Sequence, residues 1–324
     1  MTVRSPSYNR GLSLIELLVS LAIGLIVIGV GASSYIDVVS NTRSANVLGQ
    51  MTEDANIALG IMRAQVVLAG YSRPIGVQTV PITVNETTTD ETVMVRAFKG
   101  GRTAAGDANN FIYGCDGGFT STKTHELDIS QLTCASNATL PDAIAVVYEA
   151  DTENTYPNAD SLPTDCTGAA IPAQKAADIF GLRLASNKFY LNNNTLFCQG
   201  NGRADTAVSA TSDAINVDAQ AIVENIYDLQ ILYGVAPAQT PGTVRTGNQA
   251  AVAYLTAAQL NSLTGTERWS RVVSARICVE VRSATTVSGN EQTPYVDCQG
   301  AVQNTTDKRM ARTFTTTVVL HNRI

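Results

Sequence analysis

The sequence is poor in the residues on which most enzymes and nucleic-acid-binding proteins depend. It has two histidines (His125 and His321) and one tryptophan (Trp269) among 324 residues, and aromatic residues make up only 6% of it. Acidic side chains outnumber basic ones by 28 to 22, which gives a net charge of −6. A negative surface does not attract phosphate backbones, so we expect no nucleic-acid partner.

Motifs for catalysis and cofactor binding are missing as well. The sequence contains no G-x-S-x-G, no H-E-x-x-H, no phosphate-binding loop and no EF-hand loop. One acidic stretch offers oxygen ligands for calcium: Glu149, Asp151, Glu153, Asp160 and Asp165. Its spacing fits no ligand loop, so we interpret it as a solvated acidic loop. We therefore expect no enzymatic activity, no cofactor and no metal.

Charge is also missing from one long segment near the N-terminus. The twenty residues from Leu17 to Ile36 carry no formal charge, and about 20 apolar helical residues are enough to cross a bilayer. The segment is preceded by Arg4, Arg10 and Gly11, and Glu16 lies at its edge. A carboxylate there is costly in lipid, so its presence requires an explanation. One explanation is a plain signal anchor in which the Glu16 side chain reaches the headgroups.

A second explanation for Glu16 comes from the order of these residues. A secretory signal peptide is cut after its apolar core, whereas a cut after Gly11 would leave the apolar segment on the protein. This arrangement resembles the class III leader of type IV pilins and pseudopilins, which a prepilin peptidase removes. The resemblance implies a leader over residues 1–11, an N-methylated Leu12, and a Glu16 that neutralises the N-terminus of a neighbouring subunit.

The two leader arginines also predict how the chain is oriented in a membrane. Basic residues stay on the cytoplasmic side, so we expect a single pass through the inner membrane with the C-terminal domain in the periplasm. The resemblance implies that the protein later moves into a pilus at the cell surface.

An apolar stripe with helical period continues beyond the uncharged segment. Its members recur every three or four residues: Leu48, Met51, Ala55, Ala58, Met62, Gln65/Val66 and Ala69. Gly70 and Pro74 are stop signals. We predict one helix from Leu12 to Ala69, with residues 12–39 as the transmembrane or filament-core half and 40–70 as the amphipathic half. Gly24, Gly29 and Gly31 would allow either a bend or a close approach of another helix.

Residues 71–324 are predicted to form an extracytoplasmic, β-rich head. Strands are expected at 93–98, 143–148, 179–184, 226–235, 272–281 and 313–320, with a hairpin over 188–198 and a short helix from Thr256 to Leu263. Residues 99–125, 149–176 and 200–218 are predicted loops. Trp269 is expected in the core or at a sheet edge, and Arg276, Glu280 and Arg282 in solvent. An amphipathic helix followed by antiparallel strands buries its stripe on their sheet, which gives an α+β fold.

All six cysteines follow the predicted anchor, on the oxidising side of the membrane. Six thiols allow 15 pairings, and the sequence alone does not choose among them. Pairing neighbours in the sequence is the simplest hypothesis: Cys115–Cys134, Cys166–Cys198 and Cys278–Cys298. Each pair would close a loop of about 20 to 30 residues and contribute about 3 kcal/mol. The spacings match no zinc site.

Three C-terminal segments narrow the resemblance to one group of pilins. Residues 222–235, 273–283 and 312–323 are similar to segments of PilW-like minor pilins. This resemblance implies the type IV pilin fold, with disulfide-bonded loop decorations on the head. It also implies a minor pilin that assists the initiation of pilus assembly in a tip complex. Its partners would be the prepilin peptidase, other minor pilins, the major pilin, a PilY-type tip adhesin and the inner-membrane assembly platform.

Two other functions remain open on the sequence alone. The same architecture would suit a J-type pseudopilin of type II secretion. Alternatively, residues 75–220, which resemble nothing we recognise, would carry an adhesin or another binding module.

Overall fold

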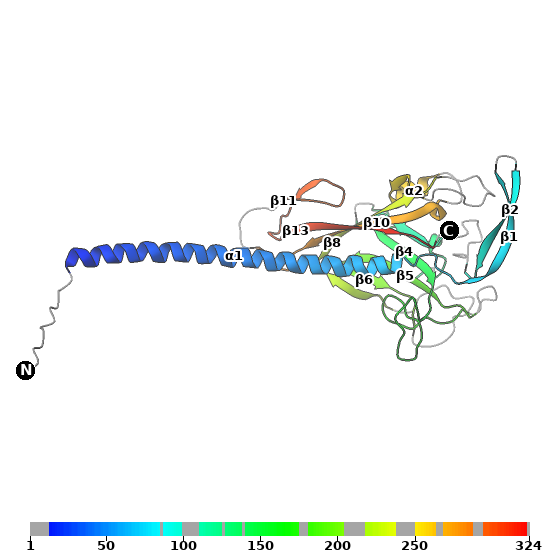
Figure 1. The fold of residues 1–324 in the computed structure, drawn as a ribbon, viewed down its shortest axis with the longest axis horizontal. Helices are drawn as coiled ribbons and strands as arrows, with labels where there is room; N and C mark the ends of the chain where they lie inside the picture. Colours follow the sequence, from blue (N-terminus) through cyan, green and yellow to red (C-terminus); the bar gives the residue numbers. More distant parts are fainter. Residues whose placement is uncertain are drawn as a thin grey trace, which may run out of the picture.

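The computed structural model describes residues 13–84, 87–98, 110–124, 127–137, 140–174, 181–203, 218–237, 250–263, 268–287 and 294–322. One long helix, α1, forms the axis of the molecule, and a β-rich head surrounds its C-terminal end (Figure 1). The N-terminal half of α1 extends away from this head (Figure 1).

Helix α1 runs from Leu14 to Val66, 53 residues, which corresponds to about 80 Å. Its buried residues are Met51, Ala55, Ala58, Leu59, Met62 and Val66, so the predicted stripe faces the core. The helix ends three residues before the predicted Ala69. A turn follows, in which Gly70 has a φ of 77° and donates its N–H to the Val147 carbonyl at 3.0 Å. Glycine adopts such a φ without the strain that a Cβ would cause.

Two antiparallel sheets form the head. The first has the order β3-β4-β5-β6-β7, with bounds Ile112–Cys115, Ala143–Glu149, Leu184–Asn192, Thr195–Gln199 and Gln220–Glu224. The second has the order β13-β10-β8-β9, with bounds Ala311–Val319, Val272–Arg282, Ile226–Val235 and Ala253–Leu255.

Smaller elements decorate this frame. Two separate two-stranded sheets pair β1 (Pro74–Val84) with β2 (Thr87–Arg96) and β11 (Pro294–Val296) with β12 (Val302–Asn304). The short helices are η1 (Ile129–Gln131), α2 (Ala257–Ser262) and η2 (Trp269–Arg271). Helix α2 starts with the predicted capping box of Thr256 and Gln259, and the Asp116 carboxylate also accepts the Ala257 N–H at 2.9 Å.

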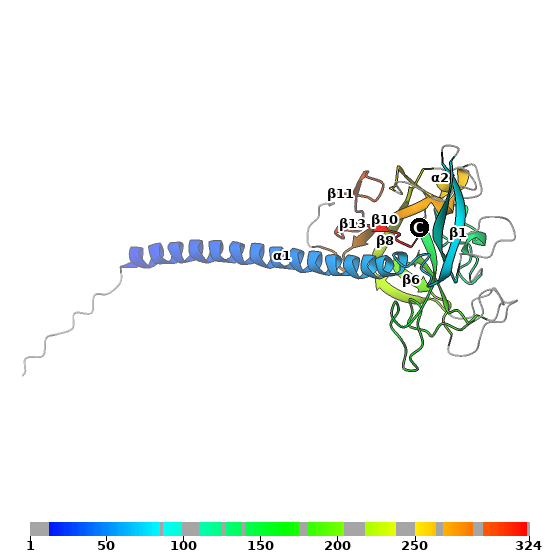
Figure 2. The same ribbon diagram turned by 45° about the vertical axis from the view of Figure 1, so that its right-hand side comes forward.

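The second half of α1 lies between the two sheets. Both ribbon views place β8, β10 and β13 on one side of it and β6 on the other (Figures 1 and 2), and α1 contacts β7, β10 and β13. The chain passes from one sheet to the other at Asn225, which has a φ of 64° between β7 and β8. The predicted α+β fold, a long helix on antiparallel strands, is therefore confirmed, with two sheets where the sequence suggested one.

Most strand predictions agree with the structure to within a few residues. β8 has the predicted bounds, 226–235. β4, β10 and β13 correspond to the predicted strands 143–148, 272–281 and 313–320. β5 and β6 form the predicted hairpin around Asn193 and Asn194. The segment 93–98 is only the end of β2, whose long hairpin with β1 was not predicted. β5 begins at Leu184, and residues 179 and 180 of the predicted strand 179–184 lie outside the described residues. The prediction of a loop over 99–125 is wrong at β3. This buried strand has only four residues, too few to show an alternation of apolar and polar side chains.

Three acidic side chains predicted to be solvated are buried. Glu149 and Asp165 are each 5% exposed and Glu280 is 4% exposed. Glu149 accepts hydrogen bonds from Ser72 Oγ at 2.6 Å and Arg73 N at 3.0 Å. Asp165 accepts from Gly202 N at 2.7 Å, and Glu280 pairs with Arg282 Nε at 2.8 Å. A carboxylate can be buried when such partners replace water. The predictions for Arg276, which is exposed, and for buried Trp269 are confirmed.

Three disulfides tie the loops to the sheets. The structure joins Cys115 to Cys134, Cys166 to Cys198 and Cys278 to Cys298. The third bond connects the outer part of the β11–β12 hairpin to β10.

Asp142 links the two sheets where β4 begins. Its backbone N–H donates to the Leu229 carbonyl at 2.7 Å, and its carboxylate accepts the Ile231 N–H at 2.7 Å. Burial raises the pKa of Asp142 from 3.8 to about 7; the Ile231 N–H opposes this rise, and the nearby Asp116 and Asp228 carboxylates add to it. The folded protein therefore keeps a proton on Asp142 at pH values where the unfolded chain has lost it.

This difference predicts a pH-dependent stability. Between pH 3.8 and about 7 the unfolded chain ionises Asp142 first, so the free energy of unfolding should fall by up to about 4 kcal/mol as the pH rises. Asp142→Asn keeps an acceptor for Ile231 N but has no proton to lose. Thermal unfolding of the full-length protein in detergent should show that the variant gains stability over the wild type as the pH rises. Parallel pH profiles of the two proteins would contradict this account.

Candidate functional site

The first half of α1 is a long, exposed apolar surface. From Leu14 to Val38 its large apolar side chains are 52% to 81% exposed. The most apolar window of α1 is long and apolar enough to cross a membrane and has no part buried in the molecule. Exposed apolar surfaces of this size mark contacts with a membrane or with other proteins.

Two hydroxyl groups on this half are satisfied inside the helix. Ser20 Oγ donates to the Leu17 carbonyl at 3.0 Å, and Ser33 Oγ donates to the Val30 carbonyl at 2.9 Å. Polar groups with partners in their own helix can enter lipid or a helix bundle without losing hydrogen bonds. The segment is thus chemically suited to both environments.

The start of α1 holds a carboxylate, Glu16, just before the uncharged run. Ser13 is the N-cap, and its Oγ accepts the Glu16 backbone N–H at 3.3 Å. Glu16 lies in the first turn, where a negative charge interacts favourably with the helix dipole. This role of Ser13 was not predicted, although S-x-x-E before an apolar run is a capping signal. Gly11 and Leu12, the predicted cleavage position, lie outside the described residues.

The three glycines of the apolar half do not interrupt α1. Gly24, Gly29 and Gly31 are helical, and a Cβ added to any of them would meet nothing within 4 Å. The helix continues through all three positions, and no part of the described chain packs against them, which leaves room for the backbone of another helix to approach.

A buried polar cluster attaches α1 to the five-stranded sheet. Gln65 Oε1 accepts hydrogen bonds from Tyr148 Oη at 2.7 Å and from Asn187 Nδ2 at 2.6 Å. Tyr148 and Asn187 lie on β4 and β5 and are fully buried; burial raises the pKa of Tyr148, so its hydroxyl stays protonated as a donor.

The C-terminus of the described chain secures the end of the same helix. Asn322 Nδ2 donates to the Val67 carbonyl at 3.0 Å, and Arg96 Nη1 donates to the carbonyls of Asn322 at 2.8 Å and Gly70 at 3.2 Å. The head therefore holds α1 both along its side and at its C-terminal end.

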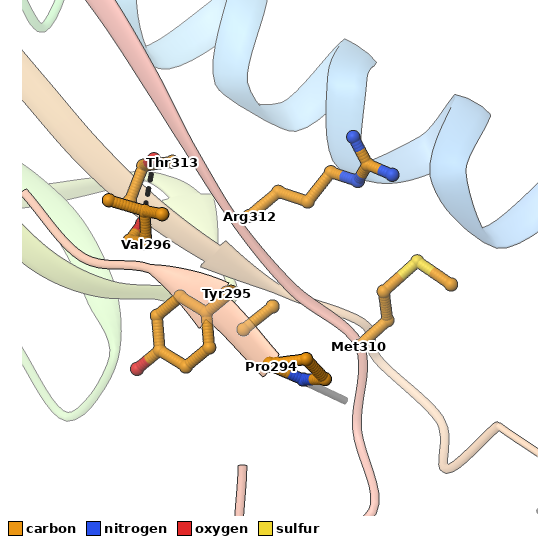
Figure 3. Close-up of a pocket in the computed structure, with 7 residues that line it drawn as sticks. Pro294, Tyr295, Val296, Met310, Arg312 and Thr313 are labelled. Carbon is orange, nitrogen blue, oxygen red and sulfur yellow. Dashed lines mark hydrogen bonds between the residues drawn. The ribbon is translucent and has the colours of Figure 1, made fainter. Parts of the chain in front are cut away.

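One shallow groove lies beside α1 (Figure 3). It holds about 320 Å³ and is lined by Pro294, Tyr295, Val296, Met310, Ala311, Arg312 and Thr313. Arg312 points toward α1 in Figure 3, and Thr313 Oγ1 donates to the Val296 carbonyl at 3.0 Å. The lining offers no nucleophile paired with a base. Within the described ranges, no three His, Cys, Asp or Glu side chains are grouped to hold a metal.

Two family models match the two ends of the chain. Residues 185–322 match the family model described as Type IV Pilus-assembly protein W, and residues 6–32 match the prokaryotic N-terminal methylation motif. The first match covers nearly all of β5 and every later strand, and the second covers Gly11, Leu12 and Glu16. No curated protein matches the sequence.

A type IV-like pilin from Thermus thermophilus aligns at a TM-score of 0.34 and 8% identity, over 84% of this chain and 98% of that chain.

The Gln65 cluster yields a test of how α1 is held. Gln65→Ala leaves the Tyr148 and Asn187 donors buried without this acceptor, which should cost about 2 to 4 kcal/mol of stability. Asn56→Ala, at an exposed position of the same helix, is the matched control and should cost less than about 0.5 kcal/mol. Thermal unfolding of the full-length variants in detergent measures both. Equal losses for the two variants would show that the cluster does not hold the helix.

Proposed function

Because the chain is a type IV pilin of the PilW family, we propose that it is a minor subunit of a type IV pilus that helps to initiate pilus assembly. The observation that carries this proposal is the uncovered apolar half of α1, joined to the prepilin motif and to a head with PilW segments. The fold supplies a structural subunit, and we propose no catalytic role, cofactor or metal.

The proposal divides the chain at the predicted boundaries. A prepilin peptidase removes residues 1–11, and the new N-terminal Leu12 is methylated. Residues 12–39 hold the protein in the inner membrane with residues 71–324 in the periplasm. Residues 40–70 connect this anchor to the head, where they form part of its core.

Assembly then replaces lipid around α1 with the helices of other pilins. Glu16 sits in the first helical turn, at the level where a neighbouring helix would bring its positive N-terminus. A charge that leaves the headgroup region needs an opposite charge beside it. Gly24, Gly29 and Gly31 would admit the neighbouring backbone.

The size of the head supports a position at the tip of the pilus. Two sheets, two extra hairpins and three disulfide-bonded loops surround α1, and a subunit at the end of a filament has fewer neighbours to exclude. There it would meet other minor pilins and a PilY-type adhesin. The PilW match over residues 185–322 favours the pilus over a type II secretion pseudopilus.

The role of Glu16 can be separated from its effect on the helix start. Glu16→Gln keeps the shape of the side chain and removes its charge, whereas Ser13→Ala removes the N-cap, worth about 1 kcal/mol, and keeps the charge. In cells, we expect normal cleavage and membrane insertion of both variants. Recovery of Glu16→Gln in sheared pili should fall at least tenfold, while Ser13→Ala should remain within twofold of the wild type.

Counting pili in the same strains tests the initiation role. A strain that carries only Glu16→Gln should make far fewer pili than one that carries Ser13→Ala. Normal piliation and normal recovery of Glu16→Gln would overturn the charge-pairing role, and normal piliation without the protein would overturn the role in initiation.

A further inference from the structure

The β1–β2 hairpin stands apart from the rest of the head. It forms its own two-stranded sheet, paired from Pro74–Arg96 at its base to Val84–Thr87 at its tip. Figure 1 places it at the distal end of the head, farthest from the N-terminus of α1, and Figure 2 shows the same hairpin in front of the head. An isolated two-stranded sheet of this kind is marginally stable in water and is stabilised by a third strand.

The base of the hairpin is held firmly. Ser72 Oγ donates to the buried Glu149 at 2.6 Å and accepts the Phe98 N–H at 2.8 Å. The Ala97 N–H donates to the Arg73 carbonyl at 3.1 Å. The β1–β2 hairpin, which we call the arm, is therefore held in a fixed direction. This lowers the entropy cost of binding a partner.

Both faces of the arm are open where the structure describes its side chains. Val77 and Gln78 point to opposite faces of the strand, yet both are exposed, and Val77 is 72% exposed. Thr79 and Thr92, which are partners in the register, are exposed as well. Exposed β-branched side chains on a paired ribbon suit contact with a further strand.

The two edges of the arm differ. Pro81 lies inside β1, and a proline within a sheet sits where its missing N–H would face outward. The outer edge of β1 therefore has a gap in its row of donors. β2 contains no proline and no lysine, two of the residues that commonly protect a free edge. In the described part of the chain the only strand with which β2 pairs is β1. At about 3.3 Å per residue its ten residues offer an edge of about 33 Å.

The arm also has a charge of one sign. Between Pro74 and Val95 the sequence has three acidic residues (Glu86, Asp90 and Glu91) and no lysine, arginine or histidine. Asp90 is exposed on β2. Arg96, at the base, is engaged with the Gly70 and Asn322 carbonyls. Like charges placed opposite each other in a sheet are destabilising, so two copies of this arm would repel each other.

From these observations we propose that the outer edge of β2 docks by strand addition onto a sheet edge of a different protein, whose edge strand carries Lys or Arg opposite Asp90 and its acidic neighbours. Main-chain hydrogen bonds along the edge supply affinity, and the opposed charges set partner and register. The partner lies beyond the distal end of the head, away from the helices that pack around α1.

This inference goes beyond the proposed function and does not depend on it. A failure of the Glu16→Gln experiment would leave the arm, its open edge and its charge unchanged.

The test uses photo-crosslinking of the full-length protein in intact cells. A photoreactive amino acid replaces Thr92 on β2 in one strain and its register partner Thr79 on β1 in the matched control. An added strand lies about 4.8 Å from β2 and about 10 Å from β1, so Thr92 should give at least five times more adduct than Thr79. Peptide mapping should place that adduct in a β-strand with Lys or Arg in a different protein.

Charge reversal completes the test. Asp90→Lys in the Thr92 strain should lower the adduct at least fivefold, whereas Asp160→Lys, at an exposed loop position, should leave it unchanged. Thermal unfolding of the variants confirms that the head is intact. The proposal is overturned by no adduct from Thr92, by equal yields from both positions, by insensitivity to Asp90→Lys, or by an adduct in lipid, glycan or another copy of this chain.

Discussion

The apolar contact between the second half of α1 and the two sheets holds the molecule together. It buries this half of the helix in the core of the head and leaves the first half exposed beyond the head. Ala55 and Ala58 are fully buried and bring the sheets close to the helix backbone, while Met51, Met62 and Val66 fill the space between. Each large apolar side chain buried there contributes about 1.5 to 3 kcal/mol. The Gln65 cluster and the Asn322 contact then fix the rotation and the end of α1.

With one half of α1 fixed in the head, its other half has no partner in the part of the chain that the structure describes. Val47, partly buried, is the first helical residue to pack against the core, and Met51 is the first to be fully buried, so more than 30 helical residues extend beyond the head. The twenty uncharged residues among them match the thickness of a bilayer. The remaining turns, from Asp37 onward, are polar enough to stand in water and keep the anchor and the head connected as one rod.

The sequence predicts those features that arise from neighbouring residues. The uncharged run, the stripe from Met51 to Val66, the strands β8 and β10 and the capping box at Thr256 are all local patterns, and the structure has each of them. Features that depend on distant partners were missed. Glu149 was assigned to solvent because Ser72 and Arg73, which hold it, lie far away in the sequence. The β1–β2 arm was missed because Pro81 and a run of threonines obscure its alternation.

The proposed function requires that the chain keeps its apolar half after processing and uses it first as a membrane anchor and then as an assembly surface. Mass spectrometry of the N-terminal peptide of the protein purified from cells shows where the mature chain begins. We expect it to begin at Leu12 and to carry one added methyl group on its amine. An intact Met1, or a mature N-terminus beyond residue 30, would contradict it.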